Sequence, residues 1–186
     1  MKKIIVCTLF ALVATGAFAQ EKGKTRFGFD AGNYFGINLL YNIQDNMNVG
    51  VRTGGAIVGK KTQAENVAFG AGITNISAIS NYYFGFGNRS AAFVGGGVGR
   101  YKLGYGFIGC PCASKQRVQE YKGYKFGGFL TTGLESRKFR LALEYNFLPT
   151  SSVVVYDHTD NSLTNDKVKN SYFAVSIGFF IGGGKR

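Results

Sequence analysis

Apolar and polar residues alternate at every second position along most of this chain, and this period restricts the fold more than any other feature. The alternation is clearest at 139–147, where aromatic and aliphatic residues alternate with polar and small ones, and it recurs at 35–43 and 172–181. A period of two places successive side chains on opposite faces of a β-strand. These three segments are therefore predicted to be strands.

Five further segments have the composition of strands, and they lie at 24–31, 47–58, 68–85, 91–107 and 122–134. In one of them the alternation changes parity after Ile73, which predicts a β-bulge near Thr74 and Asn75. The first segment continues without a parity change into the next, so 24–43 is either one strand or two strands joined at Gly32. Two strands give a total of eight, and one strand gives seven.

Composition argues against helices. The chain has 28 Gly among 186 residues, and a glycine in a helix interior costs roughly 1 kcal/mol. After the N-terminal segment, no stretch approaches the ~20 consecutive apolar residues of a membrane-spanning helix. We therefore predict an all-β protein.

The N-terminus has the pattern of a secretory signal. Two lysines precede an apolar run at 4–13 and a small-residue motif that ends at Ala19. This predicts a signal peptide at 1–19 and one domain at 20–186. Removing the signal takes two of the 22 basic residues and none of the 10 acidic ones, which leaves 20 − 10 = +10. In an exported chain with scattered Lys and Arg, that charge favours lipopolysaccharide as a partner and argues against nucleic acid.

Short and long connections alternate along the chain. Tight turns are expected at 44–46, 87–89 and 135–138, and longer polar loops at 59–67, 108–121 and 149–170. Short turns on one rim and long loops on the other are typical of outer-membrane barrels. The predicted fold is an eight-stranded antiparallel up-and-down transmembrane β-barrel with short periplasmic turns and longer extracellular loops.

Alternation alone does not distinguish this barrel from a soluble lipocalin-like barrel, whose apolar face points inward. Here the polar face is rich in Gly and Ala, which suits a crowded interior. The other face gathers Tyr and Phe near the segment ends, as the girdles of membrane barrels do. We therefore expect the apolar face to point outward, including Phe93, Tyr101, Leu103 and Tyr105.

The segments LLYNIQDNMNVGVRTG, FRLALEYNF and SYFAVSIGFFIGGGKR resemble the small outer-membrane β-barrel superfamily, the porin-family group that includes OmpX and the OmpA membrane domain. The resemblance extends from about Thr25 to the end. The Gly-rich basic tail after Phe180 is similar to tails of Bacteroidetes-type barrels. The resemblance implies the outer membrane of a Gram-negative bacterium and assembly by the barrel-assembly machinery. It implies no single activity, because one scaffold hosts many functions.

The polar face is expected to bring charged residues into the lumen. They are Asp30, Arg52, Arg100, Lys102, Lys125, Arg140 and Glu144. Eight strands leave little room for water, so these groups should pair with one another and plug the barrel. The alternative is a narrow ion path lined by an excess of basic residues.

Three other features could be read as sites. Cys110 and Cys112 could form a loop disulfide, an intermolecular bridge or a metal site, although a Cys-x-Cys ring is strained and zinc needs more ligands. His158 is the single histidine and has no nucleophile beside it, which predicts a solvated loop residue. The glycine run at 94–99 lies inside a strand pattern and should let the sheet curl. No catalytic residues and no cofactor are predicted.

Three functions remain open at this point. The first is a non-enzymatic scaffold whose loops contact an extracellular ligand or lipopolysaccharide phosphates. The basic residues in or beside these loops are Lys60, Lys61, Lys115, Arg117, Lys122, Lys167 and Lys169. The second is a small porin or a transporter for small or hydrophobic solutes, and the third is a soluble secreted lipocalin-like binder.

Overall fold

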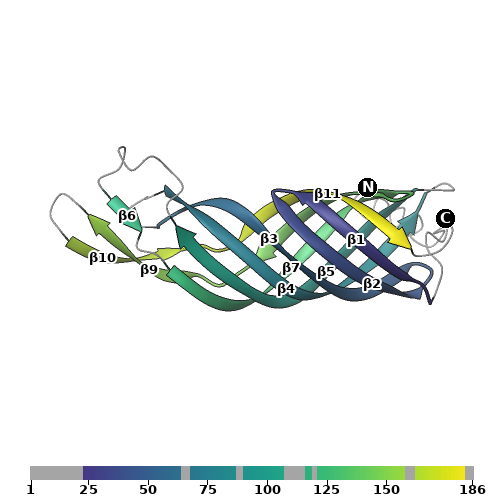
Figure 1. Cartoon of the computed structure of the whole chain (residues 1–186), viewed down its shortest axis with the longest axis horizontal. Coiled ribbons are helices and arrows are strands. Elements are labelled where there is room, and N and C mark those ends of the chain that lie inside the picture. The colour runs from purple at the N-terminus through teal and green to yellow at the C-terminus, as the bar shows by residue number, and fades with distance from the viewer. Residues whose placement is uncertain are drawn as a thin grey trace, which may run out of the picture.

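The computed structural model describes residues 23–63, 68–86, 90–106, 116–118, 121–157 and 162–182. These residues form eleven strands. Eight strands close into a barrel, and three form a small separate sheet at one end (Figure 1). In the part of the chain described, no helix is long and apolar enough to cross a membrane.

Each barrel strand pairs antiparallel with the next barrel strand in the chain, and β1 pairs with β11 to close the cylinder. The eight barrel strands are β1 (Thr25–Gly32), β2 (Tyr34–Gln44), β3 (Met47–Lys61), β4 (Ala68–Gly85), β5 (Ser90–Gly106), β7 (Tyr121–Ser136), β8 (Phe139–Phe147) and β11 (Tyr172–Gly182). The predicted eight-stranded up-and-down barrel is confirmed.

We call the end of the barrel where β1 begins and β11 ends the inner end, and the opposite end the outer end. Two tight turns at the inner end were expected and are found, Asp45–Asn46 and Arg137–Lys138. Arg137 has φ 54°, in the left-handed region that a non-glycine residue seldom adopts outside turns. The third expected turn, 87–89, lies outside the described residues.

The first hairpin turns at Gly32 and Asn33, so 24–43 is two strands. Asn33 makes this short connection possible because its side chain forms hydrogen bonds with backbone groups of β11 that have no partner on β1. Its Oδ1 accepts from the Val175 amide at 2.7 Å, and its Nδ2 donates to the Phe173 carbonyl at 3.1 Å. The amide side chain thus replaces a neighbouring strand where β1 has ended.

The predicted bulge near Thr74 and Asn75 is wrong. β4 pairs without interruption with both β3 and β5. Ile73 points into the barrel and Ile76 points out, as an unbroken alternation requires. The apolar pattern seemed to change parity because the inner face of β4 also carries apolar residues, such as Ile73, and not because the strand is interrupted. A register shift occurs instead on β2, between Asn42 and Gln44.

The expected long loop at 149–170 is largely a hairpin. It consists of β9 (Ser151–Asp157) and β10 (Ser162–Val168), and β6 (Gln116–Val118) pairs with the free edge of β9. A single bridge between Thr62 and Val168 connects this outer sheet to the end of β3. Figure 1 shows the sheet projecting beyond the outer end of the barrel.

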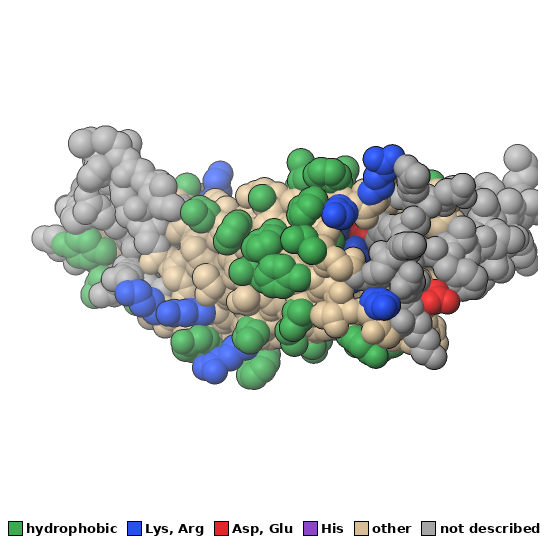
Figure 2. Space-filling model, turned by 45° about the vertical axis from the view of Figure 1, so that its right-hand side comes forward, with side chains coloured by type: hydrophobic (Ala, Val, Ile, Leu, Met, Phe, Trp, Pro, Cys, Tyr) green, Lys and Arg blue, Asp and Glu red, His purple; other side chains and the backbone are tan. Residues whose placement is uncertain are grey.

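The outer wall of the barrel is apolar. On β8 and β11 the exposed residues are those predicted from the alternation, including Leu143, Phe173 and Ile177. Figure 2 shows hydrophobic side chains across the middle of one face of the molecule, with Lys and Arg side chains toward both ends. A continuous apolar belt of this kind is the lipid-facing surface of a transmembrane barrel, and a water-soluble lipocalin-like barrel would not expose it.

Candidate functional site

The lumen holds an ion pair that crosses it from one side to the other. Arg52 lies on β3 and Glu144 on β8, four strands apart in either direction around the barrel. The guanidinium donates from Nη1 and Nη2 to the two carboxylate oxygens of Glu144 at 2.5 and 2.7 Å. Asn146 donates a further hydrogen bond to Glu144 at 2.7 Å. The pair therefore braces opposite walls of the barrel.

Aromatic rings enclose the Arg52 guanidinium. Its central carbon lies 3.6 Å from the ring centroid of Phe129 and 4.7 Å from that of Tyr34. Cation–π contact of this kind is strongest where water is excluded. Arg52 and Glu144 are 4 and 7 % exposed, so both charges are desolvated and depend on each other.

A second ion pair was not predicted from the sequence. Arg26 on β1 pairs with Glu135 on β7, and Arg26 also donates to the Tyr83 hydroxyl at 3.3 Å. Both charged side chains are almost completely buried. Arg26 has the same parity as Asp30, which could have revealed it, whereas Glu135 sits beside a turn and was assigned to that turn.

Arg140 and Asp30 are the third cation and anion buried in the lumen. Arg140 donates to Asn81 Oδ1 at 3.2 Å and lies 3.7 Å from the Phe93 ring centroid. Asp30 accepts from Asn38 at 2.6 Å. With the two ion pairs, the described lumen residues carry three buried cations and three buried anions, so their charges cancel.

Two residues expected in the lumen lie outside it. Arg100 and Lys102 are exposed on the outer wall of β5, where Arg100 is paired with the outward residues Ile76 and Phe126. The inner positions belong to Tyr101 and its neighbours of the same parity, which are buried.

The prediction failed there because it treated aromatic residues as lipid-facing. Tyrosines suit the lumen of the outer half because their hydroxyl groups find partners inside, as Tyr101 does by donating to Asn146 Oδ1 at 3.0 Å. The other expected lumen cation, Lys125, is half-buried on the inner parity of β7 and pairs in register with Tyr101.

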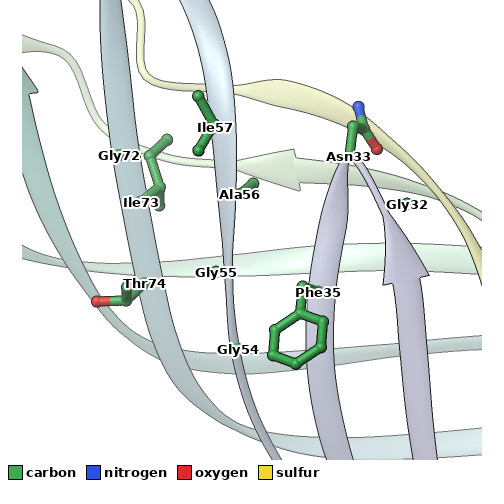
Figure 3. A pocket seen from close by; sticks show the side chains of 10 residues that line it. All are labelled: Gly32, Asn33, Phe35, Gly54, Gly55, Ala56, Ile57, Gly72, Ile73 and Thr74. Carbon is green, nitrogen blue, oxygen red and sulfur yellow. The ribbon is translucent and has the colours of Figure 1, made fainter.

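A groove of about 550 Å³ lies on the outer wall beside the tip of the first hairpin (Figure 3). Small residues of β3 and β4, including Gly55 and Gly72, form its surface, and Ile57 and Phe35 border it. Ala56 and Ile73 also line it, yet their side chains are almost fully buried. The groove is therefore a depression in the lipid-facing wall.

The remaining candidates lie partly or wholly outside the described residues. Cys110, Cys112, Lys115 and His158 belong to segments whose structure is not described. In the ranges that are described, no group of three His, Cys, Asp or Glu side chains could hold a metal ion. Lys60 lies within the described residues, and its ammonium donates to the carbonyls of Asn170 and Ser171 at 3.0 and 2.8 Å.

No protein-family model matches the chain. No curated protein sequence matches it either.

Solved structures of several small outer-membrane barrels are similar to it. The N-terminal β-barrel domain of Pseudomonas aeruginosa OprF is 12% identical with a TM-score of 0.43, over 87% of this chain and 100% of that chain. OprG from the same organism is 11% identical with a TM-score of 0.47, over 88 and 98%. Ail of Yersinia pestis is 14% identical with a TM-score of 0.39, over 87 and 100%. At these identities the likeness concerns general shape. The strand pairing itself establishes that this chain is a closed eight-stranded β-barrel, and its apolar outer wall is that of a transmembrane barrel.

Proposed function

We propose that this protein is a non-enzymatic outer-membrane barrel that serves as a scaffold for surface interactions and does not conduct ions. The barrel would anchor the outer sheet of β6, β9 and β10, and the long connections around it would meet an extracellular ligand. We propose further that residues 1–19 direct export and are removed, that residues 20–186 form the mature domain, and that the barrel-assembly machinery inserts it into the membrane of a Gram-negative cell.

The ion pair between Arg52 and Glu144 is the observation that carries this proposal. It spans the lumen between opposite strands, and the rings of Phe129 and Tyr34 fill the space beside it. A second bridge, between Arg26 and Glu135, also crosses the lumen. Eight strands enclose an interior just wide enough for side chains, so two such bridges leave little room for a continuous water path.

The main alternative is a small porin. It drew support from an expected excess of basic residues in the lumen, but Arg100 and Lys102 lie outside and the six fully buried charges cancel. Of the expected excess, the half-buried Lys125 on the inner parity of β7 remains. A lateral route for hydrophobic solutes would need an opening in the wall. The groove beside Phe35 is the nearest feature to one, and buried side chains back it on the lumen side.

Single-channel recording in planar bilayers tests the proposal. The wild-type protein should show no steady open current, because both bridges block the lumen. The double variant Arg52→Ser/Glu144→Ser should stay closed, because the bridge between Arg26 and Glu135 remains. A variant that also carries Arg26→Ser and Glu135→Ser should produce currents in protein that still shows heat-modifiable mobility. A steady wild-type current would overturn the scaffold proposal in favour of a pore.

A further inference from the structure

Arg100 and Lys102 stand on the lipid-facing wall, where a charge needs an explanation. They share the outward parity of β5 with Val94 and Val98, both exposed apolar residues. An Arg or Lys at the middle of a bilayer costs ~2–4 kcal/mol, and this cost falls to ~0–1 kcal/mol near the interface. Their height on the barrel therefore decides what they can contact.

The strand length places both cations at the outer edge of the apolar belt. Arg100 lies 100 − 90 = 10 residues beyond Ser90, the first residue of β5 at the inner end. At about 3.3 Å per residue and a tilt of about 40°, ten residues rise about 25 Å along the barrel axis. That is about the height of the whole apolar band.

The two cations border a shallow cavity of about 280 Å³ on the wall. The other lining residues come from β3, β4 and β7, and they are Thr53, Thr74, Asn75, Ile76 and Tyr124. Thr53 and Thr74 are exposed on the outer wall. The Thr53 hydroxyl already donates to the Asn75 carbonyl at 3.0 Å. The donors that the cavity can offer to the oxygens of one anion are therefore the guanidinium, the ammonium and the Thr74 hydroxyl.

Tyr124 holds the Arg100 side chain flat against the wall. The guanidinium carbon lies 3.9 Å from the centroid of the Tyr124 ring. Stacking engages the face of the guanidinium and leaves its edge N–H groups available to an acceptor. Tyrosine is also a residue that membrane proteins place at the level of the lipid headgroups.

Neither Arg100 nor Lys102 forms an ion pair with a carboxylate among the described residues. The wall beside Arg100 is apolar, because its register partners Ile76 and Phe126 are 63 and 79 % exposed. Toward the inner end of β5 the wall is apolar at Val98 and Val94, which are also exposed.

We infer that this patch, Arg100 and Lys102 with Thr53, Thr74 and Tyr124, binds the phosphate group of a phosphorylated glycolipid of the lipid A type in the outer leaflet. The cations would contact the phosphate, and the acyl chains would lie on the apolar wall toward the inner end. A phosphate dissolved in water lacks these apolar contacts, so the whole lipid is the preferred ligand. The inference requires that the barrel spans the membrane, but not that its lumen is closed.

Native mass spectrometry of the detergent-solubilised protein mixed with lipid A tests this inference. Wild-type protein should retain bisphosphorylated lipid A. The variant Arg100→Gln/Lys102→Gln should bind it at least about tenfold more weakly, because charged hydrogen bonds are lost. The matched control, Arg137→Gln/Lys138→Gln, removes the same charge at the inner end and should bind like wild type.

Two further measurements identify what is bound. We call Arg100→Gln/Lys102→Gln the wall variant. Wild-type protein should bind lipid A without its phosphates as weakly as the wall variant binds bisphosphorylated lipid A. Millimolar inorganic phosphate should not displace the bound lipid from wild-type protein. Equal retention by the wall variant, equal binding of the dephosphorylated lipid, or displacement by inorganic phosphate would each overturn the inference. If the double variant does not fold, the single variant Lys102→Gln and the loss of wild-type binding in 1 M salt serve the same purpose. Conductance does not enter these measurements, so they remain informative if the lumen proves to be open.

Discussion

The basic residues of the lumen and those of the outer wall belong to strands of one barrel but are stabilised in opposite ways. Arg52 and Arg26 are buried, and each forms an ion pair with a carboxylate on a distant strand. Arg100 and Lys102 are exposed, and neither forms an ion pair with any described residue. A buried charge must find its counter-ion inside the protein. A charge at the edge of a membrane can find one in the lipid or in water.

This contrast shows that a charge on a barrel strand carries different information according to the direction in which it points. A charge that points into the lumen indicates an ion pair that braces and closes the barrel. A charge that points outward indicates the level of the membrane surface. Four measurements test whether the two groups of charges differ in this way.

Replacing Glu144 should have the largest effect. Glu144→Gln leaves the guanidinium of Arg52 buried without a counter-ion, and removing one partner of a buried pair costs about 3–5 kcal/mol. The midpoint of unfolding in detergent and urea should fall accordingly. The double variant Arg52→Gln/Glu144→Gln, in which no charge is stranded, should recover part of the loss. A stable Glu144→Gln protein that conducts anions would show instead that water fills the lumen.

The orientation of β8 predicts the next effect. Leu143 is 54 % exposed on the lipid-facing wall, and arginine near the bilayer midplane costs about 2–4 kcal/mol. Leu143→Arg should therefore reduce the yield of heat-modifiable, membrane-inserted protein. The neighbouring change Ala142→Ser, on the inner face, should reduce it much less. Similar yields for the two variants would contradict the assigned faces.

Shortening the outer sheet should change barrel stability only slightly. Deleting residues 159–168 removes β10 and its bridge to Thr62, but no pairing between barrel strands. We expect a cost of about 1 kcal/mol or less, since changes in loop length are inexpensive. Heat-modifiable mobility on a gel checks this, and its loss would mean that the outer sheet supports the barrel. Glu65, an acidic loop residue that could serve as a control for Glu144→Gln, lies outside the described residues.

The wall cations should contribute least to stability. In detergent without lipid A, Arg100→Gln/Lys102→Gln should change the unfolding free energy by no more than about 0.5 kcal/mol, as is usual for surface substitutions. The unfolding midpoint measured beside that of Glu144→Gln makes the comparison direct. A loss as large as that of Glu144→Gln would mean that the wall cations have partners within the protein.

Much of the barrel could be predicted from local sequence. The period of two at 139–147 and 172–181 determines which side chains share a face, because successive residues of a strand point in opposite directions. Where one face is aliphatic and aromatic throughout and the other small and polar, the lipid-facing side follows as well, and Leu143 and Phe173 are exposed as expected. The short turns at the inner end followed from their polar residues.

Local sequence patterns were thus enough to predict the strand period, the strand number once Gly32 was taken as a turn, and the direction of the faces where they differ in polarity. The direction of β5 became clear only in the folded barrel, because both of its faces mix apolar residues with other types and local polarity cannot rank them. The pairing of charges also depends on the folded barrel, since the partners of Arg26 and Arg52 are more than 90 residues away in the chain. Closing the barrel brings such residues together, and no local pattern records that distance.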